Sequence, residues 1–255
     1  MYQLVLIVAA VLLSTGCRSA SVNRHLKLLD FENSIEPNAS PPKQPGVRRF
    51  LSLGRALNAS HAHTAGRPLP LTCEATGSPA PSIRWFKNNA PIYEHDTESN
   101  EIIESNPSSL GRVNSTLLVT HTNGIDVYTC LASSGNKVAR ASTVVHSIGK
   151  LSEATERSKL LPREPYILVW YKAFLDTIGN TIVLPCKSRG HPRPTITWRD
   201  NNGLVITKNP RMKVLRSGEL VISPLRWSDM GEFVCQASNA FGDKTVSTFL
   251  YPAAG

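Results

Sequence analysis

In the second half of the chain, apolar residues alternate with polar ones in short runs. Leu220 and Ile222 form one such pair, and Phe233 and Cys235 form another. Side chains two residues apart on a β-strand lie on the same face of the sheet, so each pair is expected to point into a core. The pattern therefore predicts β-strands with one buried face.

A different hydrophobic pattern opens the chain. Residues 4–13 are apolar and uncharged, and the small residues Ser14, Thr15 and Gly16 follow. Ten apolar residues are too few to cross a bilayer, but this length suits the core of a secretory signal peptide. We therefore expect residues 1–20 to be a signal peptide. Because no other stretch is apolar for long enough to span a membrane, the mature protein is expected to be secreted and extracellular.

A nine-residue segment occurs twice in related form. Residues 77–85, GSPAPSIRW, match residues 190–198, GHPRPTITW, at a period of 113 residues. Cys73 precedes Trp85 by twelve residues, as Cys186 precedes Trp198. A repeat at this distance indicates two copies of one domain.

The cysteines divide between the two copies. Cys17 falls in the signal region, and the other four cysteines allow three disulfide pairings. The repeat selects the pairing in which each copy closes its own bridge, and such bridges form in an oxidising compartment. The predicted disulfides are Cys73 with Cys130 and Cys186 with Cys235.

The second copy resembles an I-set immunoglobulin domain. The resemblance is carried by the cysteine, the tryptophan twelve residues later, and the string LxIxxLxxxDxGxFxCxAxNxxG from Leu220 to Gly242. In this family the indole packs on the disulfide, and an aromatic residue two positions before the second cysteine forms the tyrosine corner. The resemblance implies an all-β protein with two tandem immunoglobulin (I-set-like) β-sandwiches. The core residues that it implies are Trp85, Trp198, Tyr128 and Phe233.

The domain boundaries follow from composition. The polar, proline-bearing residues 21–46 are expected to form a flexible leader. Domain 1 is placed at residues 47–147, a linker at 148–164 and domain 2 at 165–252. Seventeen residues are more than a tight elbow needs, so the two domains are expected to reorient. The alternative is that Leu151, Leu160 and Leu161 dock the linker as a short helix. Domain 1 is longer than domain 2 between its tryptophan and its second cysteine, and the surplus is placed in an acidic loop at residues 94–109.

Domain 2 opens with a run, Tyr166 to Tyr171, that is apolar on both faces. A first strand normally shows one face to water, so part of this surface is expected to be covered by domain 1 or by a partner. The alternative is an ordinary strand with a large aromatic edge.

The positive charge of the chain, formally +9, is unevenly placed. Residues 186–216 hold eight basic residues and a single acid, Asp200. Such a surface attracts anionic partners, which outside the cell means heparan sulfate or an acidic protein face, whereas nucleic acid is excluded by the compartment. The alternative is a set of scattered, solvated strand positions. The candidate anion-binding residues are Lys187, Arg189, Arg193, Arg199, Lys208, Arg211, Lys213 and Arg216.

Other chemistry is sparse. The chain has no GxSxG, HExxH, Walker or GxGxxG motif, so we do not expect an enzyme. His61 and His63 are close enough in sequence to suggest a metal, but no third ligand clusters with them, so neither a metal site nor a cofactor is predicted. Three sequons are candidate glycosylation sites in a secreted protein. Their acceptors are Asn38, Asn58 and Asn114.

Four longer strings are more specific than the general immunoglobulin pattern. They are ASTVVH at 141–146, LPC at 184–186, WSDMG at 227–231 and TFLYP at 248–252. Through them the chain, from about residue 48 to residue 252, resembles the zwei-Ig family, small secreted two-immunoglobulin proteins of invertebrates. It also resembles their insect relative, a neural/ectodermal development factor that binds insulin-like peptides.

The two resemblances imply different binding functions. Zwei-Ig proteins act outside cells of the nervous system and keep axons or neurons in position, which implies contact with a cell-surface receptor, an adhesion molecule or the matrix. The insect relative sequesters insulin-like peptides and lowers insulin receptor signalling. We favour the neuronal role because the chain is so close to the bare two-domain plan. The insulin-binding alternative would need a hydrophobic groove between the domains, lined by Tyr166 to Tyr171.

Overall fold

The computed structural model describes residues 48–54, 57–64, 66–92, 105–122, 124–148 and 162–255. The predicted signal peptide, residues 1–20, and the predicted leader, 21–46, lie outside the described residues. All described strands belong to one compact unit, Val47–Gly255. No helix in the described ranges is long and apolar enough to cross a membrane.

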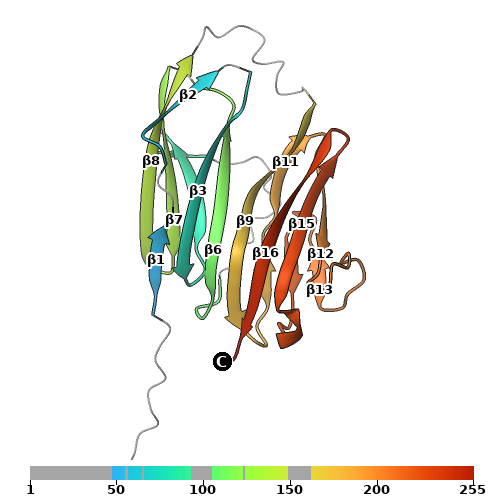
Figure 1. Ribbon diagram of the computed structural model, residues 1–255. Coiled ribbons are helices and arrows are strands. Elements are labelled where there is room, and N and C mark those ends of the chain that lie inside the picture. The colour runs from blue at the N-terminus through green and yellow to red at the C-terminus, as the bar shows by residue number, and fades with distance from the viewer. Residues whose placement is uncertain (1–47, 55–56, 65, 93–104, 123, 149–161) are drawn as a thin grey trace, which may run out of the picture. The chain divides into compact units, whose positions relative to one another are not determined.

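The strands of domain 1 form two layers (Figure 1). One layer has the order β2-β8-β7-β4-β5, and the other begins with β1-β3-β6. Alternating burial along β3 and β7 reflects the predicted period of two. The strands are β1 (Phe50–Leu53), β2 (Ser60–Thr64), β3 (Leu69–Ser78), β4 (Ser82–Lys87), β5 (Ala90–Pro91), β6 (Leu110–Val119), β7 (Ile125–Ser134) and β8 (Lys137–Ile148).

Domain 2 is a second sandwich. Its longest strand, β9, pairs with β11 along its first half and with β16 along its second half. The chain leaves the strand between β10 and β11 at Pro185 and Cys186, in agreement with the missing N–H group of proline. The elements are β9 (Arg163–Thr177), β10 (Ile182–Leu184), β11 (Lys187–His191), β12 (Thr195–Arg199), β13 (Met212–Val214), β14 (Leu220–Ile222), the 3-10 helix η2 (Trp227–Asp229), β15 (Gly231–Asn239) and β16 (Gly242–Ala253).

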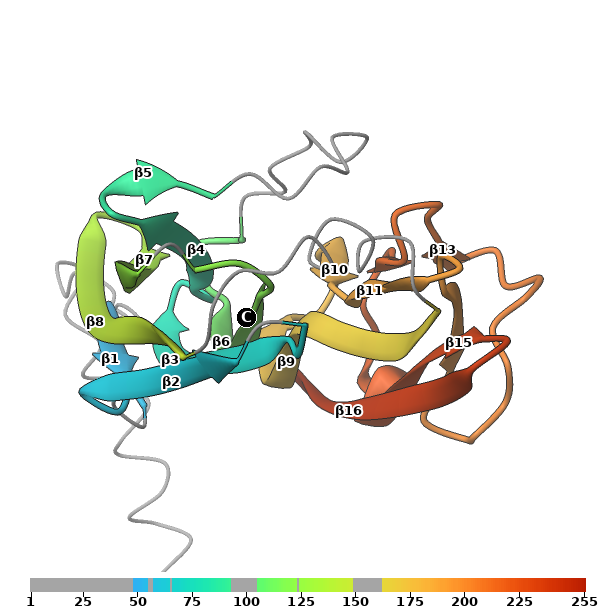
Figure 2. The same cartoon turned by 90° about the horizontal axis from the view of Figure 1, so that it is seen from above.

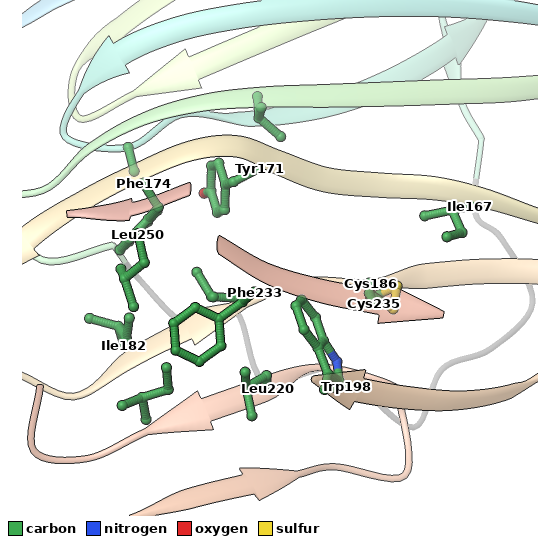
Figure 3. Close-up of a cluster of buried hydrophobic side chains, with 14 of the residues drawn as sticks. Ile167, Tyr171, Phe174, Ile182, Cys186, Trp198, Leu220, Phe233, Cys235 and Leu250 are labelled. Atoms are coloured by element: carbon green, nitrogen blue, oxygen red, sulfur yellow. A yellow bond between two sulfur atoms is a disulfide. The ribbon is translucent and has the colours of Figure 1, made fainter. Parts of the chain in front are cut away.

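Each domain contains the predicted disulfide. Cys73 is bonded to Cys130, and Cys186 is bonded to Cys235, which confirms the pairing. In domain 2 the indole of Trp198 lies beside the bridge (Figure 3) and donates to the carbonyl of Gly218 at 2.8 Å. Trp85 of domain 1 and Trp198 of domain 2 are both buried, so each sandwich is built around a disulfide and an indole.

The corner residues also occupy their predicted places. The hydroxyl of Tyr128 donates to the backbone carbonyl of His121 at 3.3 Å, as a tyrosine corner requires. Phe233, which has no hydroxyl, is fully buried in the core of domain 2. The second corner therefore keeps the packing of the ring without the hydrogen bond.

The two domains share one β-sheet, so the prediction that they reorient is wrong. Strand β9 of domain 2 pairs antiparallel with β6 of domain 1, for example Val113 opposite Tyr171 and Gly111 opposite Phe174. The shared sheet has the order β1-β3-β6-β9-β16-β15-β12, and β11 also pairs with β9. The predicted linker was placed at residues 148–164, but β8 ends at Ile148 and β9 begins at Arg163, so both strands reach into it. Residues 149–161 lie outside the described residues.

The apolar run at the start of domain 2 explains this arrangement. Of the two interpretations of this run, the structure supports the one in which it is covered, and the covering element belongs to domain 1. Tyr171 is 7% exposed and packs with Ala80 and Val113 of domain 1 in one core cluster. Gly111 permits the close approach: a Cβ atom there would lie 2.8 Å from the Cβ of Ala80 and 2.9 Å from Cε1 of Tyr171. A larger residue than glycine would therefore push the two domains apart.

A buried carboxylate joins the domains at the end of this sheet. Asp176 of β9 is fully buried, and it accepts hydrogen bonds from both domains. Domain 1 donates through the amide of Asn106 at 2.7 Å and the hydroxyl of Ser108 at 3.3 Å. Domain 2 donates through the backbone N–H of Thr177 at 2.7 Å and the amide of Asn180 at 2.9 Å. Four donors satisfy the desolvated charge, so the joint has a defined geometry.

Candidate binding surface

The shared sheet has one buried face and one outward face. Phe174 and Leu250 lie among the buried side chains of the core (Figure 3). The residues on either side of each are half-buried on β9 and exposed on β16, and Asp176, two positions after Phe174, is buried. Across the domain boundary the register aligns Leu110, Leu175 and Tyr251 in one row. The next row aligns Arg112, Ala173 and Phe249. We call the outward surface formed by these two rows and the adjacent Trp227 the joint face.

Large aromatic side chains stand exposed on the joint face. Phe249 is 43% exposed, Tyr251 is 41% exposed and Trp227 is 57% exposed. Trp227 packs edge-on against Tyr251, with 6.1 Å between the ring centroids. Exposed aromatic residues gathered on a flat, rigid surface are typical of protein-binding sites.

An ion cluster borders the aromatic residues. Glu74 of β3 pairs with Arg112 of β6 at 2.5 Å and also with Lys172 of β9. Burial of Glu74 raises its pKa, but hydrogen bonds and attraction from Lys172 and Arg112 outweigh this effect, and the pKa falls below its usual value. The carboxylate therefore stays charged at neutral pH and ties β3, β6 and β9 together on the side of the joint face.

The structure separates the eight basic residues predicted to bind anions. Four of them are exposed on β11 and on the β13–β14 hairpin: Lys187, Arg189, Lys213 and Arg216. Arg199, at the end of β12, donates to the carbonyl of Gly203. Arg193 and Lys208 lie in loops. The eight candidates therefore do not form one site, and the first four are the group carried by β11 and the β13–β14 hairpin.

The predicted role of Arg211 in anion binding does not agree with the structure. Its guanidinium binds Asp229 with two hydrogen bonds of 2.9 and 2.8 Å, and Asp229 is buried. The hydrogen bonds that Arg211 donates to Asp229 raise the pKa of Arg211 against a smaller opposing effect of burial. The charge of Arg211 is neutralised inside the protein, so this residue is not available to an anionic ligand.

The two histidines considered for metal binding have other surroundings. His63 is buried, and its Nδ1 lies 2.9 Å from the hydroxyl of Thr122, while His61 is half-buried. Within the described ranges there is no group of three or more His, Cys, Asp or Glu residues that could hold a metal ion.

The sequons differ in accessibility. Asn58 is exposed, whereas Asn114 is 4% exposed in β6, between β3 and β9. A glycan needs an outward-facing acceptor, so the structure argues against the predicted modification of Asn114. Asn38 lies outside the described residues.

Glycopeptide mass spectrometry of protein secreted from animal cells can test this difference. We expect a glycan at Asn58 and an unmodified side chain at Asn114, because β9 covers the strand that carries Asn114. A glycan at Asn114 in folded protein would contradict the pairing of β6 with β9.

Sequence reasoning missed the joint face. A signal was present in the string TFLYP, where Phe249 and Tyr251 flank the buried Leu250 at a spacing of two. Only the pairing of β16 with β9 places these aromatic residues beside domain 1. Their meaning as a surface therefore depends on a contact between distant segments.

Comparison with known proteins identifies the class. The sequence profile described as "Immunoglobulin domain" matches residues 57–134 and 165–239, so the chain belongs to the immunoglobulin-domain family.

Within this family it is a two-domain protein related to "Neural/ectodermal development factor IMP-L2" of Drosophila melanogaster. The two sequences are 34% identical over 226 residues, which is 88% of this chain and 85% of the relative. The "Zwei Ig domain proteins" zig-2 and zig-4 of Caenorhabditis elegans are each 27% identical, over 94% and 98% of their lengths and 88% and 100% of this chain.

The two-domain arrangement also has a solved counterpart. The crystal structure of neural ectodermal development factor IMP-L2 superimposes with a TM-score of 0.69 at 31% identity, and the match covers 82% of this chain and 97% of that one. The predicted resemblance to the zwei-Ig proteins and their insect relative is confirmed.

Proposed function

We propose that this protein is an extracellular binding protein that holds a small polypeptide of the insulin-like class on the joint face. The observation that carries the proposal is the shared sheet, which fixes two domains into one surface with exposed Phe249, Tyr251 and Trp227. The IMP-L2 crystal structure has a similar two-domain arrangement, and this similarity supports the insulin-binding role implied by the resemblance. The geometry thus favours the role that sequence analysis placed second.

The ligand site differs from the one expected from sequence. A groove lined by Tyr166 to Tyr171 is not formed, because Ile167, Leu168 and Tyr171 are buried in the pairing of β9 with its neighbours. The outward face of the same sheet remains accessible. A rigid surface loses little conformational entropy when a ligand docks, which favours affinity.

A matched pair of phenylalanine variants tests the site. Phe249 lies on the joint face, and Phe241 is 52% exposed in the turn between β15 and β16. Calorimetric titration of the wild-type protein with a panel of insulin-like peptides should give binding at or below micromolar concentration. Phe249→Ala is expected to weaken binding about 30-fold, the cost of one hot-spot residue of about 2 kcal/mol, and Phe241→Ala to change it less than twofold.

Two results would count against the proposal. One is that wild-type protein at micromolar concentration binds none of the insulin-like peptides. The other is an equal loss from Phe249→Ala and Phe241→Ala, which would place the contact away from the joint face.

The neuronal role is the second candidate function. It is supported by the alignments with zig-2 and zig-4, which extend over nearly the whole of both proteins. In that case the partner of the joint face is a cell-surface protein that keeps axons in place. Labelled wild-type protein should then stain the surface of living neurons without added peptide, and Phe249→Ala should reduce the staining more than Phe241→Ala.

A further inference from the structure

We propose that a second surface, on domain 2, binds a linear sulfated polysaccharide. The surface is formed by the outward side of β11, which pairs with the first half of β9, and by the β13–β14 hairpin of the three-stranded sheet β10-β14-β13. Its cations are Lys187, Arg189, Lys213 and Arg216. We call it the basic face. Figure 2 shows β11, β10 and β13 on the opposite side of the domain 2 sandwich from β16 and β15, which belong to the shared sheet.

Strand β11 lays out its cations in a line. Cys186 points into the core with no exposed area, so Lys187, the next residue, points outward. Arg189 and His191 follow at intervals of two, and all three are exposed while Ser188 and Gly190 between them are half-buried. The register of β11 with β9 shifts between Lys187 and Ser188 and again between Arg189 and His191, so β11 presents these groups along one side without a strictly regular spacing.

The other two cations come from the neighbouring hairpin. Lys213 lies between Met212 and Val214, which face the core, and its register partner Val221 is in turn opposite Val183 of β10. Arg216 is in the turn that joins β13 to β14. That turn lies against the start of β11, because a Cβ atom at Gly218 would be 2.8 Å from the carbonyl oxygen of Cys186. The turn with Arg216 is therefore adjacent to the segment with Lys187.

No described residue forms an ion pair with the four cations of the basic face. Other basic residues do have acidic partners, among them Lys87, Arg112, Lys172, Arg211 and Lys244. One acid, Glu219, lies on the same hairpin and accepts a hydrogen bond from Ser217 at 2.8 Å. Four cations against one acid leave a positive surface.

The arrangement of the four cations indicates which kind of anion they could bind. Cations spread along a strand and its neighbours match an extended chain with repeated negative groups, whereas a single small anion would need cations that converge. Sulfate groups accept hydrogen bonds from both guanidinium and ammonium groups. The two disulfides place the protein in an oxidising compartment, where sulfated polysaccharides are the abundant linear polyanions and nucleic acid is not.

The proposal is independent of the joint face. The joint face uses β16 and the second half of β9, whereas the basic face uses β11 and the β13–β14 hairpin, which lie on the other side of domain 2 from β16 (Figure 2). The two faces share none of their named residues, so the protein is able to hold a polypeptide while bound to a polysaccharide of the matrix. Such binding would keep the protein, and any ligand on the joint face, close to the cells that release it.

Chromatography on immobilised heparin with two charge-matched double variants tests the proposal. The test variant is Lys187→Gln with Arg189→Gln, and the control is Arg84→Gln with Arg140→Gln. Arg84 and Arg140 are exposed on β4 and β8 of domain 1, so both variants lose two surface charges. Wild-type protein and control should elute above about 0.15 M salt, the physiological level, and the test variant should bind at least about tenfold more weakly at that concentration.

The salt dependence adds a second measurement. The slope of log K against log salt should fall by about two for the test variant, because two fewer counterions are released. Heparin from which the sulfate groups have been removed should bind neither wild-type protein nor the two variants. Elution of wild-type protein below physiological salt, or equal shifts for the two variants, would overturn the proposal. Equal melting temperatures show that both variants are folded, and peptide binding at the joint face is measured separately.

Discussion

Replacing Tyr171 with alanine should lower the free energy of unfolding by about 3–5 kcal/mol, the usual cost of removing a large buried ring. The ring contacts Phe174 at a centroid distance of 4.9 Å, and it belongs to the core cluster that includes residues of both domains. Because the loss falls at the joint, both domains should be destabilised together. Thermal unfolding followed by calorimetry should show one transition for wild-type protein and a lower midpoint for the variant.

The conservative variant Tyr171→Phe separates packing from hydrogen bonding. The Tyr171 hydroxyl donates to the carbonyl of Pro81 at 3.1 Å, so its removal leaves a buried acceptor unpaired and should cost about 1–3 kcal/mol at neutral pH. Two separate melting transitions, with only one affected by Tyr171→Ala, would contradict the shared core.

The free energy of unfolding should depend on alkaline pH through Tyr171. Burial raises the pKa of Tyr171 to about 12, against 10.0 for an exposed tyrosine. A raised pKa stabilises the fold fully below pH 10, and this contribution is lost as the pH rises toward about 12. The loss amounts to about 3 kcal/mol, from about two pKa units. Tyr171→Phe lacks this loss, so the stability difference between wild-type protein and Tyr171→Phe should shrink across this range.

Replacing Asp229 or Arg211 with alanine should cost about 3–5 kcal/mol each, the usual effect of breaking a buried ion pair. Asp229 accepts two hydrogen bonds from Arg211 and a third, of 2.8 Å, from the backbone N–H of Arg226. Arg211→Ala leaves a buried carboxylate without its partner. Denaturant unfolding of each single variant and the double variant should show that the double loss is smaller than the sum.

The exposed Arg216 provides the control for this experiment. Arg216→Ala should change the free energy of unfolding by less than about 0.5 kcal/mol, as is usual for a surface position. A comparable loss from Arg216→Ala and Arg211→Ala, or strictly additive effects of Arg211→Ala and Asp229→Ala, would be evidence against a buried pair.

Much of each sandwich could be predicted from the sequence, because its signals are local. The period of two at Phe233 and Cys235 reflects strand geometry directly. The twelve-residue offset from Cys186 to Trp198 is a local signal of another kind, because its meaning comes from the resemblance to I-set immunoglobulin domains. The disulfides, the buried tryptophans and the tyrosine corner were therefore predicted and are confirmed.

The joint between the domains could not be derived in the same way. Val113 and Tyr171 are paired although 58 positions separate them in the sequence, and no turn between them sets the register. The run from Tyr166 to Tyr171 indicated that something covers it, but the identity of the covering strand depends on tertiary packing. The joint face was missed for the same reason.

The prediction that Arg211 binds anions was wrong for a different reason. Arg211 was grouped with surface cations because a count along the sequence treats every basic residue as solvated. The partner Asp229 is 18 residues away, and only the fold brings the two together. Lys187, Arg189, Lys213 and Arg216 remain candidates because the structure leaves them exposed.

The pairing of β9 with β6 changes what counts as a unit in this molecule. Here a fragment ending after β8 would leave the hydrogen-bonding edge of β6 uncovered, and uncovered edges recruit other strands and aggregate. The smallest piece suitable for engineering or for display on another scaffold is therefore the pair of domains.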